Sequence, residues 1–543
     1  MIVTKKNSIL KKYVQLAKTK QRDISIKDLQ EVGVTRDMVA HHFSSLSELD
    51  KQAREKHPES FKDVRLETIY SKKVLSSLRG DVKKYDRFVI TTAVTGCDVH
   101  DGFYASLKNY CKENDAALLI MIAADPANTK GKRGWGAISH KLVSETLVLE
   151  DTRLNDNLFI STIKLSAKHI DPTTGMRRIG QRNGSFIFAS PKQRLKAAPV
   201  ANNKLPHFTM TTGAITLPNY HSDMYMSQRT AYIAENDHKI GAIVVEIEDD
   251  EMYYFRQVQA DASGSFVDFG KKYSGTTVED VIPEAFVLGD WHSGSTDPTA
   301  AASWEEIVKL LKPKHLVLHD AFDGLSINHH EDHDIILKSQ RAMRGELDIK
   351  SEIAGLRNDL AEMKTWNVDM NIVIVKSNHD LFLERYLRAG KYVEDYHNHR
   401  YSLELAIALI DGKDPLKFAV QGGEVDDKVT WLGIDDDFKI EGVQLGAHGH
   451  KGSNGSRGSL PVTENMYGNS ITGHTHTPEI LRDAVQVGTS SYLKLEYNQG
   501  GASSWLHSSC LLYPGGSKQL INSIYGKYRL PPKKIKKKVE DKV

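Results

Sequence analysis

Short apolar runs, each followed directly by polar residues, recur in the second half of the chain. Three of them are Phe286–Leu288, Leu316–Leu318 and Ile372–Val375, and each is typical of a buried strand. The residues that follow are Asp-x-His after the first run, Asp-x-x-Asp after the second and Asn-His-Asp after the third. Because ligand sites in α/β sheets gather beyond the C-terminal ends of strands, we expect these residues to form one site.

The middle of the chain predicts a second set of strands and helices. Arg87–Thr92 is typical of a buried strand, Gly102–Glu113 of a helix and Ala117–Ala123 of another strand, which together predict a βαβ unit. Ile240–Ile247 and Met252–Val258 predict two further strands, and the acidic residues between them predict a polar hairpin turn. No catalytic motif lies between residues 85 and 280, so the sequence leaves the role of this region open.

Residues 1 to about 60 are predicted to be helical. Ser25 and Thr35 stand where helix N-caps are favoured, and Gly33 lies at the turn between them. The run from Val32 to Leu49 resembles the recognition half of TetR-type helix-turn-helix domains. The resemblance implies a helix at roughly 36–43 that can lie in a DNA groove.

Two interpretations of this N-terminal module remain open. If it binds DNA, Arg36 and His41 are its candidate contacts, and the basic stretch from Lys5 to Arg22 suits phosphate groups. The alternative is a small helical module that packs on the rest of the enzyme or on a partner chain.

A longer amphipathic helix is predicted between the second and third motifs. Ile349, Ile353, Leu356, Leu360 and Met363 follow the spacing of two heptads. The seam either packs on the core of the same chain or associates with a second copy, and we expect a homo-oligomer. The preceding stretch from Asn328 to Asp334 is rich in His and Asp, and we interpret it as a polar rim rather than as a third metal site.

Length and composition add limits to this picture. A chain of 543 residues is too long for one hydrophobic core, and we divide it into a helical module (1–60), a mixed α/β domain (61–280), a catalytic domain (281–515) and a basic tail (516–543). The net charge is only +2, so an attraction to nucleic acid must come from local patches. The chain has three cysteines, no signal peptide and no apolar stretch that could span a membrane. We therefore expect a cytoplasmic protein with no membrane partner.

Two more histidine motifs complete the candidate chemistry. Leu445–His450 ends in His-Gly-His and Ile471–His476 ends in Gly-His-Thr-His. Asp and Asn oxygens mixed with imidazole nitrogens suit Mn, Fe or Zn more than Ca or Mg. A bridging carboxylate can hold two such ions about 3.5–4 Å apart, the spacing that serves phosphoryl chemistry. Asp98-Val99-His100 is also Asp-x-His, but no matching motif follows it, so we expect a structural role there.

The five motifs in this order resemble the calcineurin-like metallophosphoesterase family, which includes nucleases of the SbcD type. The resemblance covers about 230 residues. It implies an α/β fold with a β-sandwich flanked by helices and a two-metal site, with Mn favoured and Fe, Zn or Mg as alternatives. It also implies the ligands: Asp290, His292 and His476 for one metal, Asp320 as the bridge, and Asn378, His448 and His474 for the other.

The same resemblance assigns roles to two residues that do not bind metal. His379 would face the phosphate and protonate the leaving oxygen, and Asp323 would hold His379 and raise its basicity. The sequence departs from the family at His319 and Ser377, where glycine is usual, and both changes affect the turn and not the ligand. His450 remains an alternative to His448, which is preferred because a glycine follows it.

The substrate is less closely defined than the reaction. DNA is favoured by the helix-turn-helix-like segment, the basic N-terminus and the lysine-rich tail, and Lys451 and Arg457 in a glycine-rich loop are further candidate phosphate contacts. The whole arrangement also resembles the pre-early proteins of T-five-like phages that are linked to host-DNA degradation, which implies a Mn-dependent DNase in the bacterial host. The alternatives are a phosphomonoesterase or small-nucleotide phosphodiesterase, and a DNA-binding regulator on a phosphoesterase scaffold.

Overall fold

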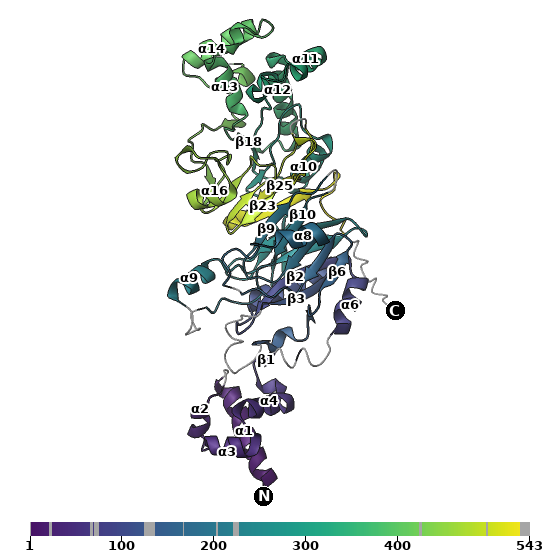
Figure 1. The fold of residues 1–543 in the computed structure, drawn as a ribbon, viewed down its shortest axis with the longest axis vertical. Helices are drawn as coiled ribbons and strands as arrows, with labels where there is room; N and C mark the ends of the chain where they lie inside the picture. The colour runs from purple at the N-terminus through teal and green to yellow at the C-terminus, as the bar shows by residue number, and fades with distance from the viewer. Residues whose placement is uncertain are drawn as a thin grey trace, which may run out of the picture.

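The protein is a mixed α/β structure in which helices and several sheets are stacked along one long axis (Figure 1). The computed structural model describes residues 2–20, 24–65, 69, 75–123, 136–166, 168–201, 205–220, 227–422, 426–495 and 498–532. The predicted α/β class is confirmed. Most of the predicted lysine-rich tail, from residue 533 onward, lies outside the described residues.

Four helices form a small N-terminal bundle around one apolar cluster. The predicted N-caps are confirmed: Ser25 forms a capping box with Asp28, and the Thr35 hydroxyl accepts a hydrogen bond from the Met38 amide. The helix predicted at roughly 36–43 has those bounds. The four helices are α1 (Ile2–Lys20), α2 (Ile26–Glu31), α3 (Arg36–Phe43) and α4 (Leu46–Lys56).

The bundle lies at one end of the molecule in Figure 1, and the helices from α11 (Ile335–Arg344) to α14 (His399–Ile410) lie at the other. A short antiparallel pair joins it to the rest of the chain, formed by β1 (Asp63–Arg65) and β4 (Ala137–Ser139). Lys62 adds an ion pair with Asp98. Among the described residues, no helix is both long and apolar enough to cross a membrane.

A five-stranded sheet follows, and it contains the predicted βαβ unit and hairpin. β2 (Arg87–Val94) and β3 (Ala117–Ala123) are parallel and connected through α7 (Asp101–Asn114). β11 (Gly241–Ile247) and β12 (Tyr253–Gln259) form the antiparallel hairpin. The strand order is β12-β11-β2-β3-β5, with β5 at Thr146–Leu147. Near this sheet lie α6 (Leu75–Lys84), α9 (Gln228–Asn236), β13 (Phe266–Asp268), β14 (Lys271–Ser274) and β15 (Thr277–Asp280).

A six-stranded sheet carries the first three motifs. Its order is β19 (Val429–Trp431), β18 (Asn371–Ile374), β17 (His315–Leu318), β16 (Ala285–Val287), β25 (His507–Leu512) and β26 (Lys518–Ser523), and the first four strands are parallel. Alternate side chains point to opposite faces. Val287 and Val317 join the core shared with the other sheets, whereas Phe286 and Leu316 join the core under the helices. The sheet therefore lies between a helical layer and a second sheet.

That second sheet has ten strands and crosses the boundary that we drew at residue 280. It runs β20 (Lys439–Ile440), β21 (Val443–Gln444), β22 (Ser470–Thr472), β24 (Ala484–Gln486), β23 (Glu479–Leu481), β9 (Arg194–Ala198), β10 (His207–Thr211), β8 (Ser185–Phe188), β7 (Leu158–Ser161) and β6 (Thr152–Asn155). β9 and β23 pair antiparallel, and the buried Arg194 donates to the Ile480 carbonyl over 2.6 Å and pairs with Glu479. The region 61–280 thus supplies half of a sheet that also holds the last motif.

The helical layer covers the outer face of the six-stranded sheet. The five seam residues of α12 are between 0% and 4% exposed and belong to the core of this chain. The core interpretation of the seam is confirmed, and the homo-oligomer stays a prediction without this helix to support it. The remaining helices are α8 (Arg177–Asn183), α10 (Pro298–Leu311), α11 (Ile335–Arg344), α12 (Ile349–Trp366), α13 (Asp380–Arg388), α14 (His399–Ile410), α15 (Pro415–Gln421) and α16 (Leu460–Tyr467).

Candidate metal centre

The first three motifs directly follow the parallel strands β16, β17 and β18, so their residues lie at one edge of the sheet. Four candidate ligands have left-handed backbones although they are not glycine: His292 (φ 52°), Asp320 (φ 43°), His474 (φ 84°) and His476 (φ 59°). Such conformations cost on the order of 1–3 kcal/mol each and cluster at functional sites. The backbone at these four residues is therefore strained in the conformation that orients their side chains.

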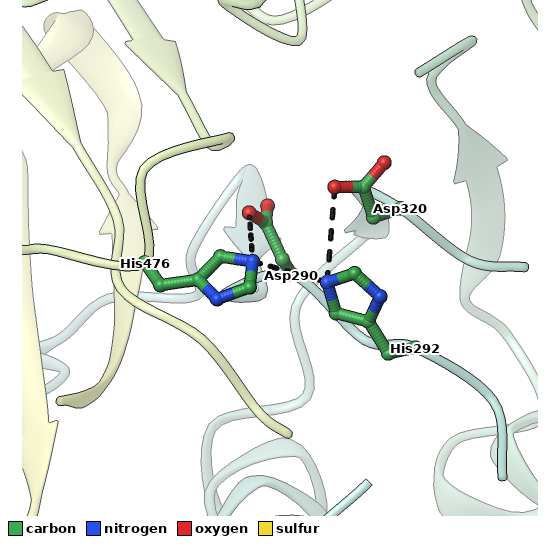
Figure 2. A group of neighbouring side chains, drawn as sticks. All are labelled: Asp290, His292, Asp320 and His476. Carbon is green, nitrogen blue, oxygen red and sulfur yellow. Dashed lines mark hydrogen bonds and ion pairs between the residues drawn. The ribbon is translucent and has the colours of Figure 1, made fainter. Parts of the chain in front are cut away.

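Asp290, His292, Asp320 and His476 form one buried cluster, whose ligand atoms all lie within 4.8 Å of one another (Figure 2). Nε2 of His476 is 3.2 Å from Oδ2 of Asp290 and 3.0 Å from Nε2 of His292. Nε2 of His292 lies 3.8 Å from Oδ2 of Asp320. Donor atoms from three motifs thus converge on one point, as the ligands of a metal ion do.

The orientation of His292 supports this interpretation. Its Nδ1 lies 3.1 Å from Oδ1 of Asp323, and its Nε2 faces Nε2 of His476 at 3.0 Å. Burial lowers the pKa of His476, although Asp290 opposes this shift. Oδ1 of Asp290 is buried with no hydrogen-bond partner among the described residues. Two imidazole nitrogens and an unpaired carboxylate oxygen are donors that a divalent cation would satisfy.

Asp320 also borders a second group of donors. Nε2 of His448 is 3.2 Å from Oδ2 of Asp320 and 3.0 Å from Oδ1 of Asn378. The ring centroids of His474 and His448 are 5.3 Å apart, and the His474 amide donates to Asp290 over 2.8 Å. Burial would raise the pKa of Asp320, but the charges of His448 and His379 hold it well below its usual range. Asp320 therefore lies between the two groups of donors.

The geometry favours His448 over His450 as the ligand. No carboxylate contact within the described part of the chain reaches His450, whose ring lies 5.4 Å from that of His448 by centroid. Burial lowers the pKa of His450 to about 3, so its ring is neutral. His448 instead contacts both Asp320 and Asn378 directly.

His379 lies beside this centre, held by Asp323. Nδ1 of His379 is 2.6 Å from the backbone oxygen of Asp323 and 3.6 Å from its Oδ1. Burial alone would lower the pKa of His379, but the charge of Asp320 and the hydrogen bond and charge of Asp323 raise it to about 10. The ring stacks on Phe382 with centroids 4.6 Å apart. His379 is thus a protonated, oriented group next to the candidate metals.

The sequence analysis did not identify two carboxylates that position these loops, the buried Asp380 and the half-buried Glu352. Asp380 accepts hydrogen bonds from the Ser377 amide and hydroxyl and from the Phe322 amide, which ties the loops after β17 and β18 together. Glu352 of α12 accepts from the Leu325 and Ser326 amides, just after Asp323. Asp380 could have been found because it completes the Asn-His-Asp motif, whereas no pattern marks Glu352.

A cavity of about 760 Å³ opens beside the centre. The candidate ligands Asp320, Asn378, His474 and His476 line it, together with His379. The opposite wall comes from the His/Asp-rich segment and α11, and Phe382 and Trp505 complete the lining. The predicted polar rim therefore faces the site. Nothing in the sequence marked Trp505, whose ring meets that of His476 with centroids 4.1 Å apart.

The four candidate nucleic-acid contacts are not among the residues that line this cavity. Arg36 and His41 are exposed on α3 in the N-terminal bundle. Lys451 and Arg457 are exposed and form an antiparallel bridge across the base of the glycine-rich loop. The structural role expected for His100 is confirmed, since its side chain accepts from the Phe103 amide and caps α7.

Comparisons with known proteins give one informative match. No protein-family profile matches the chain, and no solved structure matches it. Protein A1 of Escherichia phage T5 is 29% identical over 479 residues, which cover 82% of this chain and 84% of the phage protein. The chain is thus similar, over most of its length, to a protein of a T-five-like phage, and it has a buried cluster of Asp and His that could hold a metal ion.

Proposed function

We propose that this protein is a two-metal phosphodiesterase of the calcineurin-like type that hydrolyses DNA. The observation that carries the proposal is the convergence of Asp290, His292, Asp320 and His476, whose ligand atoms lie within 4.8 Å of one another at the ends of parallel strands. Asp320 also lies 3.2 Å from His448, which extends the donor set to a second ion.

The donor chemistry fits two divalent cations. Asp290, His292 and His476 would hold one ion, Asn378, His448 and His474 the other, and Asp320 both. Mixed oxygen and imidazole donors favour Mn, with Fe, Zn or Mg as alternatives. When bound, such ions supply charge that activates water and stabilises the phosphoryl group.

The residues of the chain perform the rest of the reaction. His379 carries the proton that the departing oxygen needs, and Asp323 fixes the orientation of its ring through Nδ1. Asp380 and Glu352 keep the loops of Asp320, Asp323 and His379 in register. The left-handed backbones of the ligands fix the donors before substrate arrives, which lowers the cost of reorganisation.

The DNA substrate rests on separate support. α3 has the length and caps of a helix able to lie in a groove, and Arg36 and His41 are exposed on it. The similarity to a phage protein is compatible with a role in degrading DNA inside an infected bacterium. Among the alternatives, a regulator on an inactive scaffold would not need a complete ligand set.

The deciding experiment measures cleavage of linear and circular duplex DNA with Mn²⁺, Mg²⁺ or EDTA. Wild-type protein is compared with Asp320→Asn, which removes the shared carboxylate charge. Mn-dependent loss of DNA that the variant lacks would support the proposal, and survival of the circles would identify an exonuclease. Intact DNA in every lane, with hydrolysis of p-nitrophenyl phosphate or cyclic nucleotides, would favour the small-substrate alternative.

A further inference from the structure

The cavity beside the metal centre has two walls of different chemistry. On one side lie Asp320, Asn378 and the histidines of the candidate centre. On the other side lies α11, which presents Ile336 and Leu337 to the same space. Ile336 is 70% exposed. The polar rim of residues 328–334 lines the same side, so Ile336 and Leu337 form an apolar patch within a mostly polar wall. A site that takes only a phosphate has no use for such a patch, which indicates a second, apolar part of the ligand.

Aromatic rings lie next to the reacting groups as well. Trp505 lines the cavity and contacts the His476 ring, and Phe382 lines it and stacks on His379. Nucleic-acid proteins use such rings to stack unpaired bases, because every base has a π-face. The combination of a phosphate-directed centre, an aromatic ring and an aliphatic side chain matches the parts of a nucleotide.

The α11 wall is held in place by buried and surface ion pairs. Arg341 of α11 is 4% exposed and pairs with Glu331 of the preceding turn. Asp332 pairs with both Lys338 of α11 and Lys391 after α13. The wall is therefore fixed before a ligand arrives, which reduces the entropy lost on binding.

The volume limits the occupant. About 760 Å³ lies within the range of pockets that enclose small ligands, and it can enclose a single nucleotide but not a segment of double helix. A base that reaches the apolar patch of Ile336 and Leu337 must leave the helical stack, as it does in enzymes that act on extruded or single-stranded nucleotides.

We propose that the cavity holds one unpaired nucleotide beside the scissile phosphate, with its base packed between Trp505 and Ile336. The inference rests on the proposed phosphodiesterase function and names its substrate as a strand with an unpaired nucleotide at the cleavage site. Fully paired duplex is cut more slowly than single strands, frayed ends or mismatches.

The test uses single-stranded oligonucleotides in which an abasic residue replaces each nucleotide around the main cleavage site in turn. In wild-type protein, one position should show a loss in kcat/KM of about 10-fold or more, the range of one base stacked on an aromatic ring. In Ile336→Asn and Trp505→Leu this difference between intact and abasic strands should disappear. Ile335→Asn is the matched control, because Ile335 is its neighbour on α11, is 75% exposed and does not line the cavity.

Each outcome decides between the two proposals. Wild-type protein that cuts intact and abasic strands equally well overturns the nucleotide pocket but leaves the phosphodiesterase intact. Variants that lose activity equally on both strands show a purely structural role for Trp505 and Ile336, which also overturns the pocket. Failure of wild-type protein with Mn²⁺ to cut any strand overturns the proposed function and the pocket with it.

Discussion

Replacement of His379 by alanine tests whether this chain supplies a proton to the leaving group. Nδ1 of His379 is committed to the backbone oxygen of Asp323 at 2.6 Å, so Nε2 is the nitrogen left for a substrate. The pKa of about 10, which Asp320 and Asp323 raise against the effect of burial, keeps the ring protonated at neutral pH. The positive charge of bound cations would lower this pKa toward the working pH, where a general acid is most effective.

The expected loss depends on the leaving group. A positioned general acid contributes about 10²–10⁴-fold, which corresponds to about 2.7–5.4 kcal/mol of transition-state stabilisation. His379→Ala should lose that factor on DNA, whose alkoxide leaving group needs a proton. It should lose much less on bis(p-nitrophenyl) phosphate, because p-nitrophenolate leaves without one.

The assay compares both substrates at saturating Mn²⁺, with bound metal measured by mass spectrometry. His100→Ala is the control, since His100 belongs to an Asp-x-His sequence but caps α7 and does not line the cavity. Equal losses on DNA and on the p-nitrophenyl ester, with metal retained, would refute the role as proton donor. Full activity of His379→Ala on DNA would refute any catalytic role.

Four further predictions address the metal centre, the fold and the DNA contacts. Asp320→Asn should abolish binding of at least one Mn²⁺ in calorimetry, because this carboxylate lies between both donor groups. Gly473→Ala should weaken metal binding about 10–100-fold, since its Cβ would lie 2.1 Å from Oδ1 of Asp290; unchanged affinity would contradict the geometry. Burial lowers the pKa of His238 to about 4. The free energy of unfolding should therefore be highest above pH 6.5 and decrease by roughly 3 kcal/mol in total as the pH falls toward 4. Denaturant unfolding of His238→Gln should lack this pH-dependent decrease. Arg36→Ala should weaken DNA binding and reduce the slope of log K against log salt by about 1, measured by fluorescence anisotropy.

The sequence predicted the candidate site best where its residues directly follow a strand. The apolar runs before Asp290, Asp320 and Asn378 became β16, β17 and β18, and their parallel order brings the three motifs together. The caps at Ser25 and Thr35 were equally accessible, because a cap is a local interaction between a side chain and nearby amides.

The pairing of strands far apart in the sequence and the residues of the cavity walls could not be predicted from local patterns. β9 and β23 are joined by Arg194 and Ile480, which are 286 residues apart, and alternating side chains reveal the face of a strand but not its partner. Glu352 belongs to a helix that its apolar seam predicts, and such a seam carries no information about the roles of the polar residues beside it. Trp505 lies in an irregular segment between strands, where periodicity carries no information.

The placement of the N-terminal bundle at the end of the molecule opposite α11–α14 has a consequence for processivity (Figure 1). If α3 binds DNA there, the bound strand stays attached to the protein while the distant metal centre cleaves it. Each further cleavage then takes place at a raised effective concentration of substrate. A fragment too short to span both ends loses this advantage. Degradation would then proceed quickly on long DNA and stall at a fragment length set by the separation of the two ends.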